Sequence, residues 1–204
     1  DRYSAFGDVF IQEPQHVDRY WNTMTLQSPL APSLSDYIAL RTCIFNGTCT
    51  FRDNRIDLAT DPTNTANKVM KFTAVAPSVG MVTSKSSIES TTAYFKRGSE
   101  MWFEARYYFA SELPYSIADF ESGWIDQSPG PRIVISGGAL AVENKFGNKL
   151  MFRQERPIPI PLATWVKVKI HVVFHEEKGR IELWQDGVRV LDVDAPTLPL
   201  SIAI

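Results

Sequence analysis

The chain has 204 residues, a formal net charge of −2 and a hydrophobic fraction of 44%, which are ordinary values for a folded domain with a substantial core. These values exclude a chain that is mostly disordered, and the near-neutral charge argues against a nucleic-acid partner. No apolar run approaches the about 18 residues that a membrane-spanning helix needs, so we expect no membrane span.

Residues 1–67 are predicted to form a wrapping N-terminal segment with loops, because prolines and polar residues interrupt any regular pattern. Within it, one short helix is expected near residues 35–41, with Ser35 as its N-cap. The stretch 54–67 is rich in Asp, Asn and Thr, which predicts a loop.

Two cysteines, Cys43 and Cys49, flank the turn-forming pair Asn46-Gly47. We expect a disulfide between them, and the alternative is a pair of free thiols. A disulfide is typical of an oxidising compartment, so the sequence predicts a secreted or periplasmic protein.

From residue 68 onward, short strands are predicted, beginning with 69–75 and 80–89. The clearest strand covers 100–109, because apolar and mixed side chains alternate along it. One face of this strand is expected to enter the core: Met101, Phe103, Ala105, Tyr107 and Phe109. The other face mixes aromatic and charged groups: Trp102, Glu104, Arg106 and Tyr108.

The next strands, 132–136 and 139–145, flank Gly137-Gly138 and predict a hairpin. The segment containing Asp119 and Glu121 is read as a loop. Residues 150–154 are expected to form an edge strand. Prolines then follow at positions that exclude regular sheet pairing: Pro157, Pro159 and Pro161.

Residues 165–174 alternate clearly and predict a half-buried strand. Turns at Lys178-Gly179 and Asp186-Gly187 separate it from strands expected at 180–185 and 188–193. A last strand is expected at 200–204. This succession of short strands predicts an all-β sandwich or barrel, and we expect a single domain over 1–204 with a core sandwich at 68–204.

The run from Trp165 to His171, followed by Lys178 to Gly187, resembles the penultimate hairpin of concanavalin-like jelly rolls. More narrowly, it is similar to polysaccharide lyases of the heparin lyase I, glucuronan lyase and alginate lyase type. The stretches 84–88, 94–98 and 128–132 add to the likeness, which covers roughly residues 68–204. The resemblance implies a β-sandwich jelly roll that cleaves a uronate-containing glycan by β-elimination.

The chain departs from these lyases in two motifs. It lacks the Gln-Ile/Val-His triplet of the alginate lyases. Its Tyr-Phe-Lys-Arg-Gly stretch at 94–98 lies in the middle of the chain, whereas the similar family motif lies near the C-terminus, so the catalytic tyrosine of that motif is not transferred to Tyr94.

A lyase must neutralise a uronate carboxylate while a base removes the adjacent C5 proton and an acid protonates the leaving oxygen. The expected catalytic candidates are cations together with groups that transfer protons: Lys85, Arg106, Arg132, Tyr108 and His171. Substrate contacts are expected from aromatic and polar side chains: Trp102, Glu104, Glu143 and Lys145.

Two other functions share this fold, so they stay open at the sequence level. One is a non-catalytic carbohydrate-binding, lectin-like or adhesin module, and the other is a glycoside hydrolase with paired carboxylates. We expect a monomer that acts on an anionic polysaccharide and needs no cofactor for its chemistry. A structural Ca²⁺ would fit the jelly roll, with Asp8 and Asp192 as acidic candidates.

Overall fold

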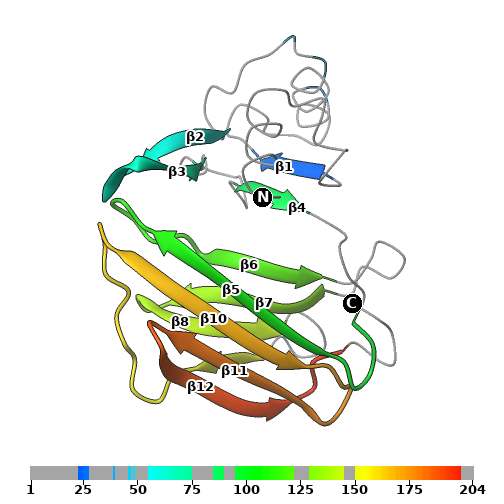
Figure 1. Ribbon diagram of the computed structural model, residues 1–204. Coiled ribbons are helices and arrows are strands. Elements are labelled where there is room, and N and C mark those ends of the chain that lie inside the picture. Colours follow the sequence, from blue (N-terminus) through cyan, green and yellow to red (C-terminus); the bar gives the residue numbers. More distant parts are fainter. Residues whose placement is uncertain are drawn as a thin grey trace. The chain divides into compact units, whose positions relative to one another are not determined.

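Figure 1 shows the protein as a computed structural model. The structure describes residues 23–27, 39, 46, 48, 55–74, 85–89, 95–121, 129–144 and 150–198. The chain divides into two compact units, Asp1–Thr92 and Ala93–Ile204, which are described separately.

In the first unit, the described strands form two antiparallel pairs. Strand β1 (Thr23–Gln27) pairs with β4 (Lys85–Glu89), and β2 (Arg55–Asp61) pairs with β3 (Asn64–Thr73). The strand predicted at 69–75 is confirmed over 69–73, within β3, and the strand predicted at 80–89 is confirmed over 85–89, as β4.

The prediction of a loop at 54–67 is wrong, because β2 and the first part of β3 form a hairpin there. The Asp61 carboxylate closes its turn by accepting hydrogen bonds from the Thr63 amide and hydroxyl, both at 2.8 Å, and from Asn67 Nδ2 at 3.2 Å. Polar residues that usually indicate a loop thus bond to one another along a mostly exposed hairpin.

The second unit is a sandwich of two four-stranded antiparallel sheets, which Figure 1 shows lying one behind the other. The first sheet has the order β12-β11-β10-β5, with bounds Val188–Ala195, Gly179–Gln185, Trp165–Val173 and Glu100–Tyr108. The second has the order β6-β7-β8-β9, with bounds Ser116–Glu121, Pro129–Ser136, Ala139–Asn144 and Met151–Arg153.

The core lies between these two sheets. The first sheet contributes fully buried side chains that alternate along β10 and β11: Val166, Val168, Ile170, Val172, Ile181 and Leu183. The second sheet contributes Ile133, Ile135, Leu140 and Val142. Removing each such side chain from water favours folding by about 1.5–3 kcal/mol. Because two antiparallel sheets enclose this core, the prediction of an all-β sandwich is confirmed.

Both predicted tight hairpins are confirmed by their backbone angles. Gly137 and Gly138 have φ of 60° and 80°, and Asp186 and Gly187 have φ of 50° and 84°. Two successive residues with positive φ are typical of the mirror-image turns that match the twist of antiparallel strands. These turns join β7 to β8 and β11 to β12.

Strand β6 was missed, because the segment containing Asp119 and Glu121 was predicted to be a loop. It is an edge strand with irregular register at two places, between Ser116 and Ala118 and between Asp119 and Glu121. Such irregularities break the period of two that identifies a strand in a sequence. The predicted edge strand at 150–154 is confirmed as β9.

Several predictions fall wholly or largely outside the described residues. They concern the helix at 35–41, the Cys43–Cys49 disulfide, the last strand at 200–204, and the side chains of Asp8, Lys85 and Lys145. The single-domain organisation also stays a prediction. In the part of the chain that the structure describes, no helix has the length and apolar character needed to cross a membrane.

Candidate functional site

The side of the first sheet that faces away from the core carries the aromatic and charged side chains expected to share a face. Antiparallel pairing sets Trp102 opposite His171, and Tyr108 opposite Trp165. We call this surface the Trp102 face and define it by Trp102, Glu104, Arg106, Tyr108, Trp165, Lys167, Lys169 and Trp184.

At one end of the Trp102 face, three rings and a cation lie together. The Trp102 indole stacks on the His171 imidazole at 3.9 Å between centroids, and Trp184 lies 5.8 Å from Trp102. Lys169 Nζ lies over both indoles, at 4.4 Å and 4.8 Å from their centroids. These contacts are attractive, since the π face of an indole attracts a cation.

At the other end, the cations have separate partners. Lys167 Nζ lies 2.7 Å from Glu104 Oε1, so Glu104 pairs with Lys167 and not with its neighbour Arg106. The Arg106 guanidinium lies over the Trp165 indole at 5.3 Å, and the Tyr108 ring contacts the same indole at 5.5 Å. Arg106 and Tyr108, two of the predicted catalytic residues, therefore pack on one tryptophan.

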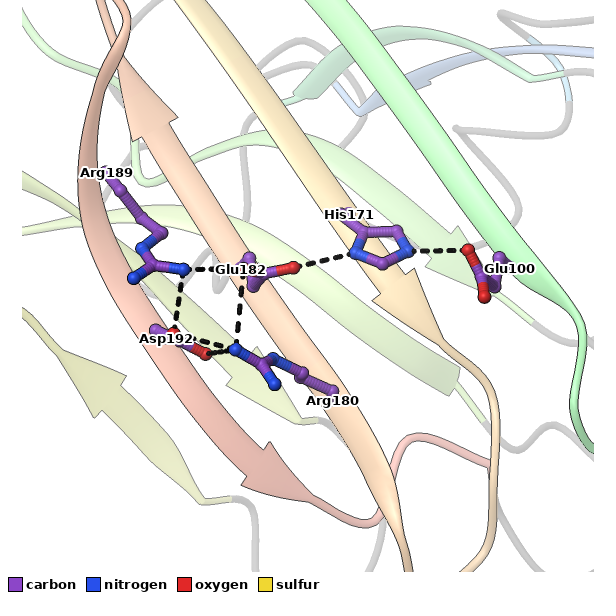
Figure 2. A network of polar contacts seen from close by, with 6 residues as sticks. All are labelled: Glu100, His171, Arg180, Glu182, Arg189 and Asp192. Atoms are coloured by element: carbon purple, nitrogen blue, oxygen red, sulfur yellow. Dashed lines mark hydrogen bonds and ion pairs between the residues drawn. The ribbon is translucent and has the colours of Figure 1, made fainter.

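Two carboxylates hold the His171 imidazole (Figure 2). The Trp102 indole stacks on this ring. His171 Nδ1 lies 2.8 Å from Glu182 Oε2, and its Nε2 lies 3.1 Å from Glu100 Oε2. The residue is only 8% exposed. Because both ring nitrogens have partners and Trp102 covers the ring, this imidazole is better placed to position Trp102 than to exchange protons with a ligand.

The same network continues across β11 and β12 through alternating charges (Figure 2). Arg189 Nη1 lies 2.9 Å from Glu182 Oε1 and 2.9 Å from Asp192 Oδ2, and Arg180 also pairs with Asp192 at 2.9 Å. The hydrogen bond from His171, followed by that from Arg189, lowers the pKa of Glu182.

Asp192, a predicted metal ligand, is therefore held between two arginines. Within the described residues, no group of three or more His, Cys, Asp or Glu side chains is placed to hold a metal ion.

The second sheet carries a different polar cluster on the side that faces away from the core. Register pairs Arg132 with Glu143 and Val134 with Ala141 across β7 and β8, while Ile133 and Val142 point into the core. Val134 and Ala141 are also buried. The part of this surface around Val134 and Ala141 is therefore shielded from solvent. We call the surface the Arg132 face and define it by Tyr115, Asp119, Arg132 and Glu143.

Arg132 lies between two carboxylates on this face. Its Nε donates to Asp119 Oδ1 at 2.5 Å, and its Nη1 lies 3.5 Å from Glu143 Oε2. All three side chains are roughly one-fifth exposed, at 22%, 20% and 16%. A partly buried guanidinium fixed at two of its nitrogens is rigid, which suits recognition of a planar anion.

Tyr115 completes the Arg132 face. The Ile135 amide donates to the Tyr115 carbonyl at 2.8 Å, which fixes the residue beside β7. Its pKa is raised, first by partial burial, then by the hydrogen bond to Glu143 and by the negative charges of Glu143 and Asp119, against the opposing charge of Arg132. The hydroxyl therefore keeps its proton at neutral pH and acts as a hydrogen-bond donor.

The predicted site residues are divided among three places. Trp102, Glu104, Arg106, Tyr108 and His171 lie on the outer side of the first sheet, whereas Arg132 and Glu143 lie on the outer side of the second. Lys85 belongs to β4 of the other unit. Sequence reasoning missed Tyr115 and Asp119 as site residues, because β6 was not identified and its register with β7 could not be inferred.

Two sheets around one apolar core define a β-sandwich, and aromatic, cationic and carboxylate groups gather on its outer faces. The sequence model of a family described as polysaccharide lyase matches residues 20–200. The chain therefore belongs to the polysaccharide lyase family, and its substrate is a polysaccharide. No match was found among curated proteins or among solved structures.

Proposed function

We propose that the chain cleaves a uronate-containing polysaccharide by β-elimination at the Arg132 face. The observation that carries this proposal is the clustering of Tyr115, Glu143 and Arg132 in a member of the polysaccharide lyase family. Elimination next to a uronate carboxylate needs a proton donor, a proton acceptor and a cation, and these three side chains supply one of each.

In the proposed reaction, the guanidinium of Arg132 binds the uronate carboxylate. A guanidinium has five N–H donors in a planar fork, and Asp119 and Glu143 orient this one without using all of them. Neutralising the carboxylate makes the C5 proton more acidic, because negative charge develops on that group when the proton leaves.

Glu143 and Tyr115 then share the proton transfers. Glu143 takes the C5 proton, the C5–H electron pair forms the C4–C5 double bond, and the C4–O bond breaks. The leaving oxygen takes the Tyr115 hydroxyl proton. The proton on Glu143 returns to Tyr115 along their hydrogen bond, which restores both groups. Because the pKa of Tyr115 is raised, the hydroxyl carries its proton when the substrate binds, so a proton is available for the leaving oxygen.

This sequence of steps uses only side chains of the chain, so it needs no metal or other cofactor. A polymeric acidic substrate also favours action outside the cytoplasm, which agrees with the oxidising compartment expected for Cys43 and Cys49. We propose a secreted or periplasmic monomer. A structural Ca²⁺ involving Asp8 remains part of the proposal.

The test is to incubate the protein with a panel of uronate polysaccharides and record ultraviolet absorbance and new reducing ends in parallel. Suitable members are glucuronan, alginate, ulvan, pectate and heparin-type chains. β-Elimination yields a conjugated unsaturated uronate that absorbs in the ultraviolet, whereas hydrolysis does not.

A rise in absorbance with one polymer is the expected result. New reducing ends without a rise would replace the proposal with hydrolysis, for which Asp119 and Glu143 would be the carboxylate pair to examine. A flat trace with no new ends, from protein shown to be folded, would contradict enzymatic cleavage.

A further inference from the structure

Trp102 is a large aromatic side chain that the fold keeps both exposed and fixed. It is 55% exposed, although the underside of its indole stacks on His171. His171 is in turn anchored by Glu182 and Glu100, as Figure 2 shows. A rigid, solvent-facing ring loses little conformational freedom when a ligand stacks on it, so it favours binding.

Cations lie beside this ring and along the same face. Lys169 Nζ lies over the indoles of both Trp102 and Trp184, and Arg106 lies over Trp165. With Lys167, the Trp102 face carries three cations and the carboxylate of Glu104, and the carboxylate of the adjoining Glu100 lies 3.1 Å from His171 Nε2. The acids of the neighbouring network are already paired with arginines and with His171.

A uronate chain offers features that match this surface. Each sugar ring has an apolar face that can lie flat on an indole, and each carboxylate can pair with a nearby ammonium or guanidinium. Single exposed apolar residues are ordinary, but contiguous rings with interleaved cations are typical of a binding surface.

We propose that the Trp102 face is a second, non-catalytic binding surface for an anionic polysaccharide chain. It shares its class of ligand with the proposed function but none of its residues, because the Arg132 face belongs to the other sheet. Binding here would keep the protein on its polymer between cleavage events at the Arg132 face.

The experiment is native gel electrophoresis of the protein through gels that contain polyglucuronate, polygalacturonate, a neutral glucan or no polymer. We expect retardation in the two acidic gels, weaker retardation at high salt, and none in the glucan gel. Trp102→Ala and Lys169→Gln should each weaken apparent affinity about tenfold. Lys68→Gln, which removes an exposed cation from β3 in the other unit, is the matched control and should migrate like the wild type.

Equal retardation of the wild type and both variants on the Trp102 face would overturn the proposal, as would loss of retardation in Lys68→Gln to the same extent. Equal retardation in the neutral glucan gel would contradict the proposal that the ligand of the Trp102 face is anionic. The proposed lyase activity and the proposed binding surface are tested independently, because cleavage is measured by absorbance and binding by migration in the gel. If retardation depends on Trp102 but absorbance does not change with any polymer, the binding surface is supported and the proposed lyase activity is contradicted.

Discussion

On the Trp102 face, rings stack on one another and on a buried imidazole, and cations lie over their π surfaces. On the Arg132 face, the ring of Tyr115 ends in a hydroxyl bonded to Glu143, beside a guanidinium held by two carboxylates. The first arrangement presents fixed surfaces and charge. The second places a proton donor, a proton acceptor and a cation within one cluster, which is what elimination requires.

From this contrast we expect His171 and Tyr108 to contribute little to catalysis, although both residue types can transfer protons. His171 has both nitrogens engaged and lies under Trp102, and Tyr108 packs on Trp165. A residue type that can transfer protons does so only where its polar atom can reach the ligand. Location on the sheet therefore matters more than residue type in distinguishing the two faces.

The largest expected effect comes from Arg132→Lys. Lysine keeps the charge between Asp119 and Glu143 but loses the planar fork, so kcat/KM should fall by about 10²–10³-fold through weaker stabilisation of the uronate charge. Steady-state kinetics on the polymer that responds in the absorbance assay measures the effect.

The matched control is Arg97→Lys, because Arg97 pairs with Glu176 in an exposed turn. Activity within about twofold of the wild type is expected for this variant, as for most exposed sites away from a functional cluster. If the two variants lose activity equally, Arg132 has no special part in the reaction.

A second prediction concerns the stability of the sheet that carries the Trp102 face. A Cβ on Gly179 would lie 2.6 Å from the Ala195 carbonyl oxygen and would press into Thr197. Thr197 is fully buried, and its hydroxyl donates to the Val173 carbonyl at 2.7 Å, so it has little room to move. Gly179→Ala should lower the free energy of unfolding by about 1–3 kcal/mol in urea titrations.

The neighbouring exposed Lys178 provides the control, since Lys178→Ala should change the free energy of unfolding by less than about 0.5 kcal/mol. An unaltered urea midpoint for Gly179→Ala would show that the start of β11 accommodates a Cβ more readily than the packing implies.

The third and smallest effect is a pH dependence that originates in the network under Trp102. The pKa of Glu182 is lowered from its ordinary value of 4.5, so its ion pairs stabilise the fold above that value and are lost as pH falls through the lowered one. Glu182→Gln should be less stable than the wild type near neutral pH, and the difference should narrow as the solution is acidified.

Urea titrations at several pH values measure this narrowing. Glu104→Gln, which breaks a half-exposed pair with Lys167, is the control and should lower stability by no more than about 1 kcal/mol. If the stability difference between Glu182→Gln and the wild type stays constant with pH, the ion pairs of the Glu182 carboxylate are not the origin of the pH dependence.

The sandwich was predictable because burial on one side imposes a period of two on the apolar side chains of β5 and β10. Turn chemistry predicted two hairpins, since Gly137-Gly138 and Asp186-Gly187 accept the positive φ that such turns need. The β2–β3 hairpin was hidden because its polar side chains satisfy one another in a mostly exposed strand pair.

The candidate site was less predictable than the fold. Alternation correctly grouped Trp102 with Arg106 and Tyr108, because that grouping needs only one strand. Predicting the Arg132 face would have required the register of β6 against β7. The register shifts beside Asp119 interrupt the alternation by which β6 could have been recognised in the sequence. Tyr115 precedes that strand, so its meeting with Glu143 depends on a pairing that periodicity does not reveal.

The central claim is tested most directly by comparing Tyr115→Phe with Tyr108→Phe in the absorbance assay. Each variant removes one hydroxyl from one face, so the two substitutions match chemically. We predict that Tyr115→Phe lowers kcat by at least about 100-fold with little change in KM, while Tyr108→Phe stays within about threefold of the wild type. A full kcat in Tyr115→Phe together with a large loss in Tyr108→Phe would contradict the account and move the chemistry to the Trp102 face.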